Sequence, residues 1–182
     1  MTPLKELLQQ ADQLKTSRHQ DITITEDTIK ELHRTVLTGG GTTPADSYRT
    51  GMPAIDDHGY QPPHPEDVPR LTGHLADQIR SSKSSLHPIE LAAMAGKRLI
   101  DIQPFTSANE ETAFLLMNRI LVSEGYRPIT IGTERREAYQ QALTISRWQS
   151  SSAATSRNRS LISGSLMRML WDRYCRALFS SP

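Results

Sequence analysis

Residues 87–131, HPIELAAMAGKRLIDIQPFTSANEETAFLLMNRILVSEGYRPITI, form the stretch around which the rest of the chain is expected to pack. The stretch contains two apolar helical patterns joined by a short loop over residues 102–111. The second pattern, residues 113–122, is apolar on nearly all sides, which is typical of the central helix of a domain. Gly125 and Pro128 follow it as stop signals. We therefore expect the other elements to surround this helix pair or to lie over its loop.

Other parts of the chain are predicted to be helices around this pair. Helices are expected to begin at Thr2-Pro3, at Thr25-Glu26-Asp27 and at Pro65-Glu66-Asp67, because caps, prolines and first-turn acids are typical start signals. Helical patterns also cover residues 134–148 and about 159–178, whereas residues 45–64 are short extended pieces broken by glycine and proline. His33 has no partner histidine at metal-ligand spacing, so we expect a packed side chain rather than a ligand.

Composition limits the classes of function. The chain has 182 residues, 36% of them hydrophobic, and we expect one domain over residues 1–182. The net charge of +1 argues against nucleic-acid binding, and no apolar run reaches membrane-spanning length. The single Cys175 fits a reducing compartment, so a cytoplasmic location is expected, with signal-less secretion into a host cell left open. The arginines that concentrate after Arg147 are interpreted as a solvated helix face, with a docking patch for an acidic partner as the minority interpretation.

The central stretch resembles the core of the Fic (Fic/Doc) family, in which a helix-loop-helix carries the loop His-x-Phe-x-Asp/Glu-Gly-Asn-Gly/Lys-Arg. The flanks match at residues 87–93, 115–118 and 125–129. Within the loop, the matching residues are Pro104, Phe105 and Asn109. The remaining motif positions differ: Gln103 stands at the histidine, Ser107 at the acidic residue, Ala108 at a glycine, Glu110 at the second glycine or lysine, and Glu111 at the arginine.

The resemblance implies an all-α, Fic-like helical domain with a central helix-loop-helix over about 87–131 and a small β-hairpin flap over about 46–62. In the family, the flap is an edge strand that holds a target segment by main-chain pairing. By this resemblance, Tyr48, Arg49 and Ile55 are expected to contact such a target. The alternative is that the segment is a proline-rich surface loop without this role.

The chemistry of the loop departs from that of the family. There, the histidine is the general base, the acidic residue holds a magnesium ion, and the arginine binds phosphate oxygens. Gln103 has no basic nitrogen near neutral pH, Ser107 offers one neutral oxygen, and Glu110 and Glu111 present negative charge to phosphate. Our leading hypothesis is therefore a catalytically degenerate Fic-fold protein that binds a protein partner, with no metal site and no cofactor.

Two alternatives are left open. One is a diverged Fic-type transferase that places a nucleotidyl or other phosphate-containing group on a protein hydroxyl. Only this alternative uses ATP and magnesium, and His58 or His64 is then a conceivable replacement base. The other is a regulatory subunit that pairs with an active Fic enzyme, and a homo-oligomer is left open as well. The family's inhibitory pattern, Ser/Thr-x-x-x-Glu-Gly/Asn, is absent from the sequence, which fits a protein without activity to restrain.

A structural role is also predicted for the loop acids. Ser107-Ala-Asn-Glu110 has the Ser-x-x-Glu spacing of a capping box. In that arrangement Ser107 accepts a hydrogen bond from the backbone N–H of Glu110, and the Glu110 carboxylate accepts one from the N–H of Ser107. The spacing therefore predicts that the protein's own carboxylate fills the anion site at this helix N-terminus.

Overall fold

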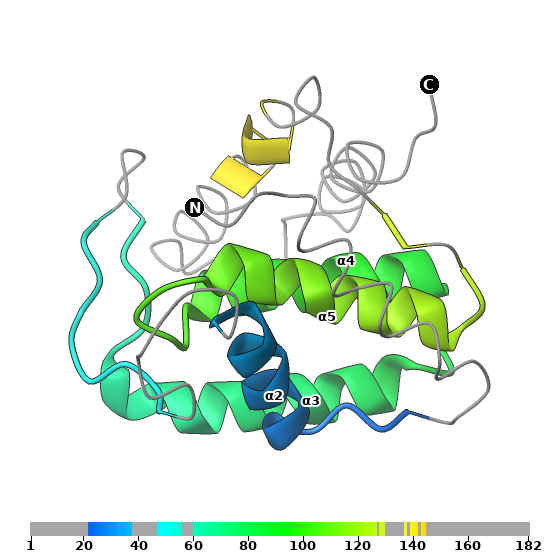
Figure 1. Cartoon of the computed structure of the whole chain (residues 1–182), viewed down its shortest axis with the longest axis horizontal. Helices are drawn as coiled ribbons and strands as arrows, with labels where there is room; N and C mark the ends of the chain where they lie inside the picture. The colour runs from blue at the N-terminus through cyan, green and yellow to red at the C-terminus, as the bar shows by residue number, and fades with distance from the viewer. Residues whose placement is uncertain are drawn as a thin grey trace, which may run out of the picture. The chain divides into compact units, whose positions relative to one another are not determined.

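The computed structural model describes residues 22–37, 47–55, 60–126, 128–129, 137, 139–141 and 143–144. Its elements are the helices α2 (Glu26–Leu37), α3 (Val68–Ser82), α4 (Pro88–Ile102) and α5 (Asn109–Ser123), with the short 3-10 helix η2 (Pro65–Asp67) before α3 (Figure 1). No strand is assigned within these described ranges. The fold is helical, as predicted. None of the helices in the described ranges has the length and apolar content needed to cross a membrane.

The chain divides into two compact units, one of residues 1–54 with 61–128 and the other of residues 55–60 with 129–182. The labelled helices all belong to the first unit. Tyr139 and Leu143 of the second unit are helical and buried, in agreement with the helix expected over 134–148. The helices expected from Thr2 and over about 159–178 lie outside the described residues, and the single domain over 1–182 stays a prediction.

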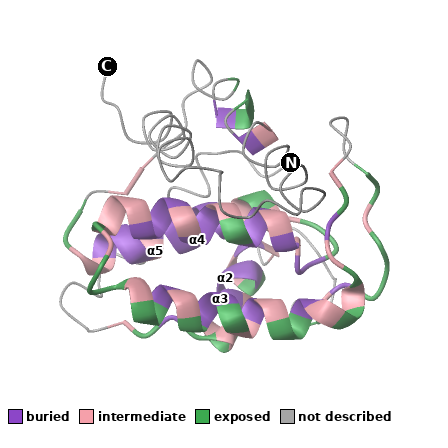
Figure 2. Ribbon diagram, turned by 180° about the vertical axis from the view of Figure 1, so that it is seen from behind, coloured by how far each residue is buried: buried purple, intermediate pink, exposed green. Residues whose placement is uncertain are grey.

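Helix α5 is the core of the first unit. It packs against both α4 and α2, and α3 packs against α4. Buried residues occupy nearly the whole circumference of α5, which confirms the expectation from its sequence (Figure 2). Gly96 on α4 lies directly against the fully buried Met117 of α5. The absence of a side chain at Gly96 therefore lets α4 and α5 approach closely.

The ends of α4 and α5 are fixed by local hydrogen bonds. At the start of α4, the Nδ1 atom of His87 accepts from the N–H of Ile89 at 3.3 Å, and Glu90 Oε2 accepts from the N–H of His87 at 3.1 Å. This is a capping box built on a histidine. At the end of α5, Gly125 adopts a φ of 79°, a left-handed conformation that glycine adopts without steric cost. The predicted stop at Gly125 is confirmed.

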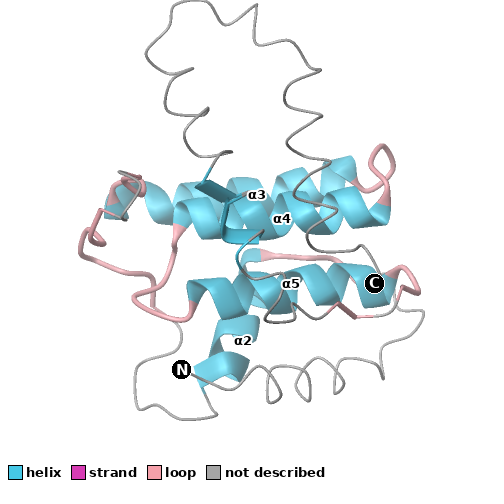
Figure 3. Ribbon diagram, turned by 90° about the horizontal axis from the view of Figure 1, so that it is seen from above, coloured by secondary structure: helices cyan, strands magenta, loops and turns pink. Residues whose placement is uncertain are grey.

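The flap segment, defined as residues 47–55 and 60–64, differs from the expected β-hairpin. These described residues form loops without a paired ladder, as Figure 3 shows, and residues 56–59 lie outside the described ranges. Instead of ladder pairing, the N–H of Arg49 donates to the carbonyl of Pro104 at 2.9 Å, between α4 and α5. The flap segment is thus attached to the loop that joins the two central helices.

Candidate functional site: the loop between α4 and α5

The motif loop, residues 103–108, joins α4 to α5 and has an unusual backbone. Gln103 and Ala108 are the two non-glycine residues with positive φ in the described part of the chain, at 46° and 57°. A left-handed conformation costs an L-residue roughly 1–2 kcal/mol. Gln103 closes α4 by donating its N–H to the carbonyl of Leu99 at 2.9 Å. The loop therefore holds two costly conformations that surrounding contacts must stabilise.

Asn109 braces the loop from inside. Its Oδ1 accepts from the N–H of Phe105 at 2.9 Å, and its Nδ2 donates to the carbonyl of Phe105 at 2.8 Å. Phe105 itself is only 1% exposed. Because a planar amide can make both bonds at once, Asn109 closes the turn around Phe105. The two residues that match the family at these positions thus support each other.

His33 of α2 braces the loop from outside. Its ring stacks on the Phe105 ring with centroids 3.7 Å apart and an interplanar angle of 2°. Its Nε2 lies 3.2 Å from the carbonyl oxygen of Ser107. His33 is buried, so the expectation of a packed side chain is confirmed. No sequence pattern predicts its contact with the motif loop, because α2 and the loop are far apart along the chain.

The predicted capping box at Ser107 and Glu110 is wrong. Helix α5 begins at Asn109, its N-cap is Ala108, and no side chain caps it. Both Ser107 and Glu110 are exposed. The amide of Asn109 bonds to the backbone of Phe105, which sets the helix start two residues after Ser107. The Glu110 carboxylate therefore does not fill the N-terminus of α5, although both loop acids remain in its first turn.

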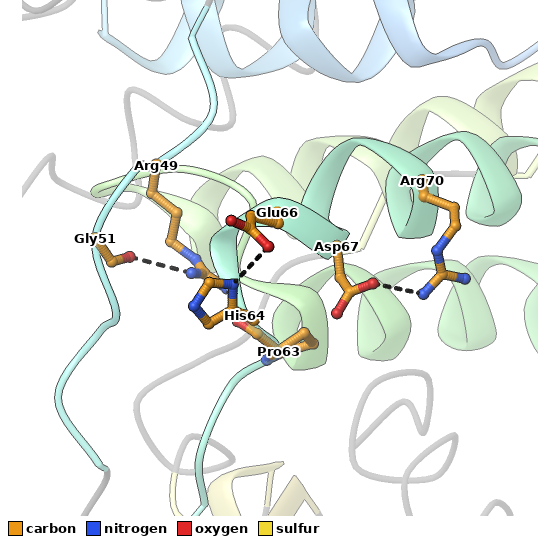
Figure 4. A network of polar contacts seen from close by, with 7 residues as sticks. All are labelled: Arg49, Gly51, Pro63, His64, Glu66, Asp67 and Arg70. Carbon is orange, nitrogen blue, oxygen red and sulfur yellow. Dashed lines mark hydrogen bonds and ion pairs between the residues drawn. The ribbon is translucent and has the colours of Figure 1, made fainter.

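Arg49 is buried, with 5% exposure, and its guanidinium donates to four carbonyl oxygens. Its Nε donates to Gln103 at 2.6 Å, and its Nη1 to Gly51 at 3.1 Å. Its Nη2 donates to Pro63 at 2.6 Å and to Ile102 at 3.3 Å. Figure 4 shows the side chain reaching from the flap segment toward Pro63. The guanidinium thus supports the protein's own backbone, and target contact by this residue stays a prediction.

Tyr48 is half-buried beside the motif loop. Its ring is tilted against the Phe105 ring with centroids 5.8 Å apart, and the Lys30 ammonium lies 4.7 Å from its centre. Burial raises the pKa of the Tyr48 phenol above its ordinary value of 10.0, and the neighbouring Glu26 carboxylate adds to this shift. The hydroxyl is buried without a well-formed hydrogen bond in the described structure. Tyr48 therefore contributes to packing, and any contact with a target stays a prediction.

Three further candidate residues, Ile55, His58 and His64, belong to the predicted flap or its end. Ile55 is 61% exposed, and Met52 on the same segment is 46% exposed. His64 lies 3.8 Å from the Glu66 carboxylate, and both side chains are largely exposed. His58 lies outside the described residues. The flap segment thus presents apolar side chains to solvent, together with one exposed histidine.

The loop does not fit a magnesium ion. The cation prefers several oxygen ligands with carboxylates among them, and Ser107 supplies a neutral hydroxyl at the relevant position. Within the described ranges, no three His, Cys, Asp or Glu side chains gather as a metal-binding group. At the motif loop, the described side chains thus lack the carboxylate that would hold magnesium at the position of Ser107.

Comparison with known proteins identifies the family. Residues 23–121 match the model of the Fic/DOC family. The chain is also 37% identical over 141 residues to the Protein adenylyltransferase Fic of Nematostella vectensis, a match that covers 77% of this chain and 32% of that protein. This chain belongs to the Fic/DOC family. It spans about a third of the length of that curated relative.

Solved structures have the same fold. A Fic domain containing signaling protein from Bacteroides thetaiotaomicron superposes with a TM-score of 0.64 at 26% identity, over 96% of this chain and 68% of the other. IbpAFic2 covalently tethered to Cdc42 gives a TM-score of 0.58 at 25% identity, over 76% of this chain and 46% of the other. Fic structures with a bound protein are thus among the neighbours of this chain.

Proposed function

We propose that this chain is a Fic-fold protein that acts by binding another protein and transfers no AMP. One observation carries the proposal: the motif loop has a firmly braced backbone but lacks the groups that the reaction needs. The braces are His33, Arg49 and Asn109. At the position of the general base stands Gln103, an amide that cannot accept a proton near neutral pH. The proposed function accordingly uses neither nucleotide nor metal.

The charge of the loop supports the same proposal. Glu110 and Glu111 both stand in the first turn of α5, where the helix dipole stabilises acidic side chains. A phosphate bound at this helix end would face the same two charges. Two like charges in contact, about 4 Å apart, cost on the order of 1–4 kcal/mol between bulk-water and surface dielectric. Glu110 and Glu111 therefore stabilise helix α5 and oppose the binding of a ligand that carries phosphate.

The expected partner is a protein. Among the structural neighbours, IbpAFic2 has been solved covalently tethered to Cdc42, which supports a protein as the class of partner for this chain. On this chain, Met52 exposes apolar surface close in sequence to Arg49, which contacts the motif loop, and Ile55 is exposed as well. Exposed apolar side chains on an unpaired segment suit contact with another protein. The proposal therefore assigns partner contact to the flap segment.

The first test is direct. Purified protein is incubated with ATP, magnesium and cell lysate, and intact-mass and peptide spectra are searched for an added nucleotidyl group. We expect none on the chain itself or on any lysate protein. An added group that disappears in Gln103→Ala would overturn the proposal.

A second test separates loss of chemistry from loss of nucleotide binding. Calorimetry with millimolar ATP should detect no binding to the wild type, whereas Glu110→Gly with Glu111→Arg should bind. The matched control is Glu66→Gly with Asp77→Arg, which changes the net charge equally at two exposed sites away from the loop. Binding by the loop variant and not by the control places the repulsion at the loop. Equal binding by both would show that only net charge matters.

A diverged Fic-type transferase is the second candidate, and one observation favours it. No side chain caps α5, so the first-turn N–H groups have no side-chain acceptor. Helix N-termini of this kind are able to bind anions. If wild-type protein binds ATP as tightly as the Glu110 and Glu111 double variant, this candidate replaces the first. His64→Ala then tests the exposed histidine as the base, through its effect on transfer.

A further inference from the structure

We infer that Arg49 is a positioning residue that couples the flap segment to the motif loop, so that the two segments move as one body. The inference concerns how the proposed docking site is set and regulated. Its use in partner binding rests on the proposed function, but the coupling itself is a property of the chain alone.

The position of Arg49 is the first observation. Ser47, Thr50, Gly51 and Met52 around it are exposed, whereas Arg49 is 5% exposed. Arginine is rarely this buried unless its donors are satisfied. Here a single guanidinium donates to carbonyl groups of both flap arms and of the motif loop. A side chain that only covered the surface would not need these bonds.

The bonds of Arg49 connect three separate pieces of chain. The outgoing flap arm is held at Gly51, the returning arm at Pro63, and the junction of α4 with the motif loop at Ile102 and Gln103. The planar guanidinium has five N–H donors in a fixed fork, so the relative placement of its acceptors is constrained. When one of these pieces moves, the others lose a bond or follow it.

The junction of α4 with the loop is where such a constraint has most effect. Ile102 is the last residue of α4, and Gln103 is its C-cap with left-handed backbone. Terminal helix carbonyls lack intrahelical partners and lie at the negative end of the helix dipole, where a cation is favoured. The guanidinium therefore stabilises the conformation of Gln103 that turns the chain into the motif loop. The backbone bond from the Arg49 N–H to Pro104 fixes the next residue as well.

A consequence follows for the docking site. A partner that pulls the flap segment away from the loop must break the bonds of Arg49 and release Gln103 from its strained conformation. A partner that binds the flap segment in its present position leaves the bonds of Arg49 and the conformation of the motif loop unchanged. Arg49 thus links the position of the flap segment to the conformation of the motif loop through a side chain that is itself buried.

The test is amide hydrogen exchange on the whole chain without any partner, which keeps it independent of the proposed function. Reporter amides are those of Arg49, Gln103 and Phe105, each of which donates a hydrogen bond. Arg49→Ala should increase exchange at all three sites by at least about tenfold, and Arg49→Lys by less, because an ammonium cannot reproduce the fork. The control Arg70→Ala removes a 70% exposed arginine that pairs with Asp67 at 2.8 Å, and it should change none of the three.

A second measurement uses the wild type alone and therefore does not depend on how the variants fold. At sub-denaturing urea, the amides of Arg49 and Phe105 should share one opening equilibrium with the same urea dependence. Faster exchange confined to the flap segment in Arg49→Ala would overturn the inference. So would wild-type opening equilibrium constants at the two amides that differ by more than about tenfold in urea. In either case Arg49 would hold the flap segment in place without coupling it to the motif loop.

Discussion

Replacing Gly96 by alanine tests how closely α4 and α5 approach each other. A Cβ atom on Gly96 would lie 2.5 Å from Met117 Sδ and 2.6 Å from its Cγ, well inside the usual contact distance of about 3.5–4.0 Å. Met117 is fully buried and has no solvent into which to move. Overpacking of this kind costs roughly 1–3 kcal/mol, whereas the change from glycine to alanine in a helix gains about 1 kcal/mol.

Gly73 provides the matched control, because it also lies inside a helix but has space around it. A Cβ there would meet only Glu26 Oε2, at an ordinary 3.7 Å. Gly73→Ala should therefore show the propensity gain of about 1 kcal/mol without a clash. We expect Gly96→Ala to be less stable than Gly73→Ala by about 1–3 kcal/mol in urea unfolding, with an unchanged slope.

A double-mutant cycle identifies the clashing partner. Met117→Ala alone should cost about 2–5 kcal/mol, because it leaves a cavity between the helices. In the Gly96→Ala background the same change should cost less, since it removes the clash and the new methyl group fills part of the space. If Gly96→Ala is as stable as Gly73→Ala, or if the two changes at this contact are simply additive, the close approach of α4 and α5 is wrong.

Three further outcomes are expected. Leu116→Ala should lower the free energy of unfolding by about 2–5 kcal/mol in urea titrations, because this side chain is fully buried. Asn109→Ala should cost about 1–3 kcal/mol, because it leaves the buried N–H of Phe105 without its acceptor; an unchanged stability would contradict the brace. Since the folded-state pKa of Tyr48 is raised, its stabilisation is present below pH 10 and lost above it. Melting temperatures of Tyr48→Phe should therefore fall less than those of the wild type above about pH 10.

The helices were predictable from sequence, because each buries one apolar pattern. The periodic residues Ile29, Leu32 and Val36 are all buried on α2, and the all-round apolar pattern of residues 113–122 gives the central helix. The start of the third predicted helix is less regular, since Pro65–Asp67 forms a 3-10 turn before α3. Apolar periodicity was sufficient to predict these helices, because the helix faces that it marks are the ones that tertiary packing buries.

The braces of the motif loop were not predictable, because they join residues far apart in sequence. The sequence predicted that His33 is packed, but it did not predict that its ring stacks on Phe105. The capping box failed for a related reason: the amide of Asn109 competes for the helix start and bonds to Phe105. A real capping box lies at His87, where the spacing to Glu90 is right but the cap is a histidine instead of serine or threonine. To predict a helix cap from a short polar motif, one must therefore know which other side chains compete for the same backbone groups.

The energetics of the motif loop connect its shape to the proposed function. Left-handed Ala108 and Gln103 each cost roughly 1–2 kcal/mol, and α5 gains no side-chain cap in return. The Ser-x-x-Glu spacing offers an alternative cap for this helix start. The amide of Asn109 opposes this cap from within, and the stacked His33 and the buried Arg49 hold the loop from outside. The shape therefore depends on the surrounding fold and on Asn109, and not on side chains at the positions of the family's base, acid and arginine. Under the proposed function, the reactive positions need carry no catalytic group as long as these contacts keep the flap segment against the loop.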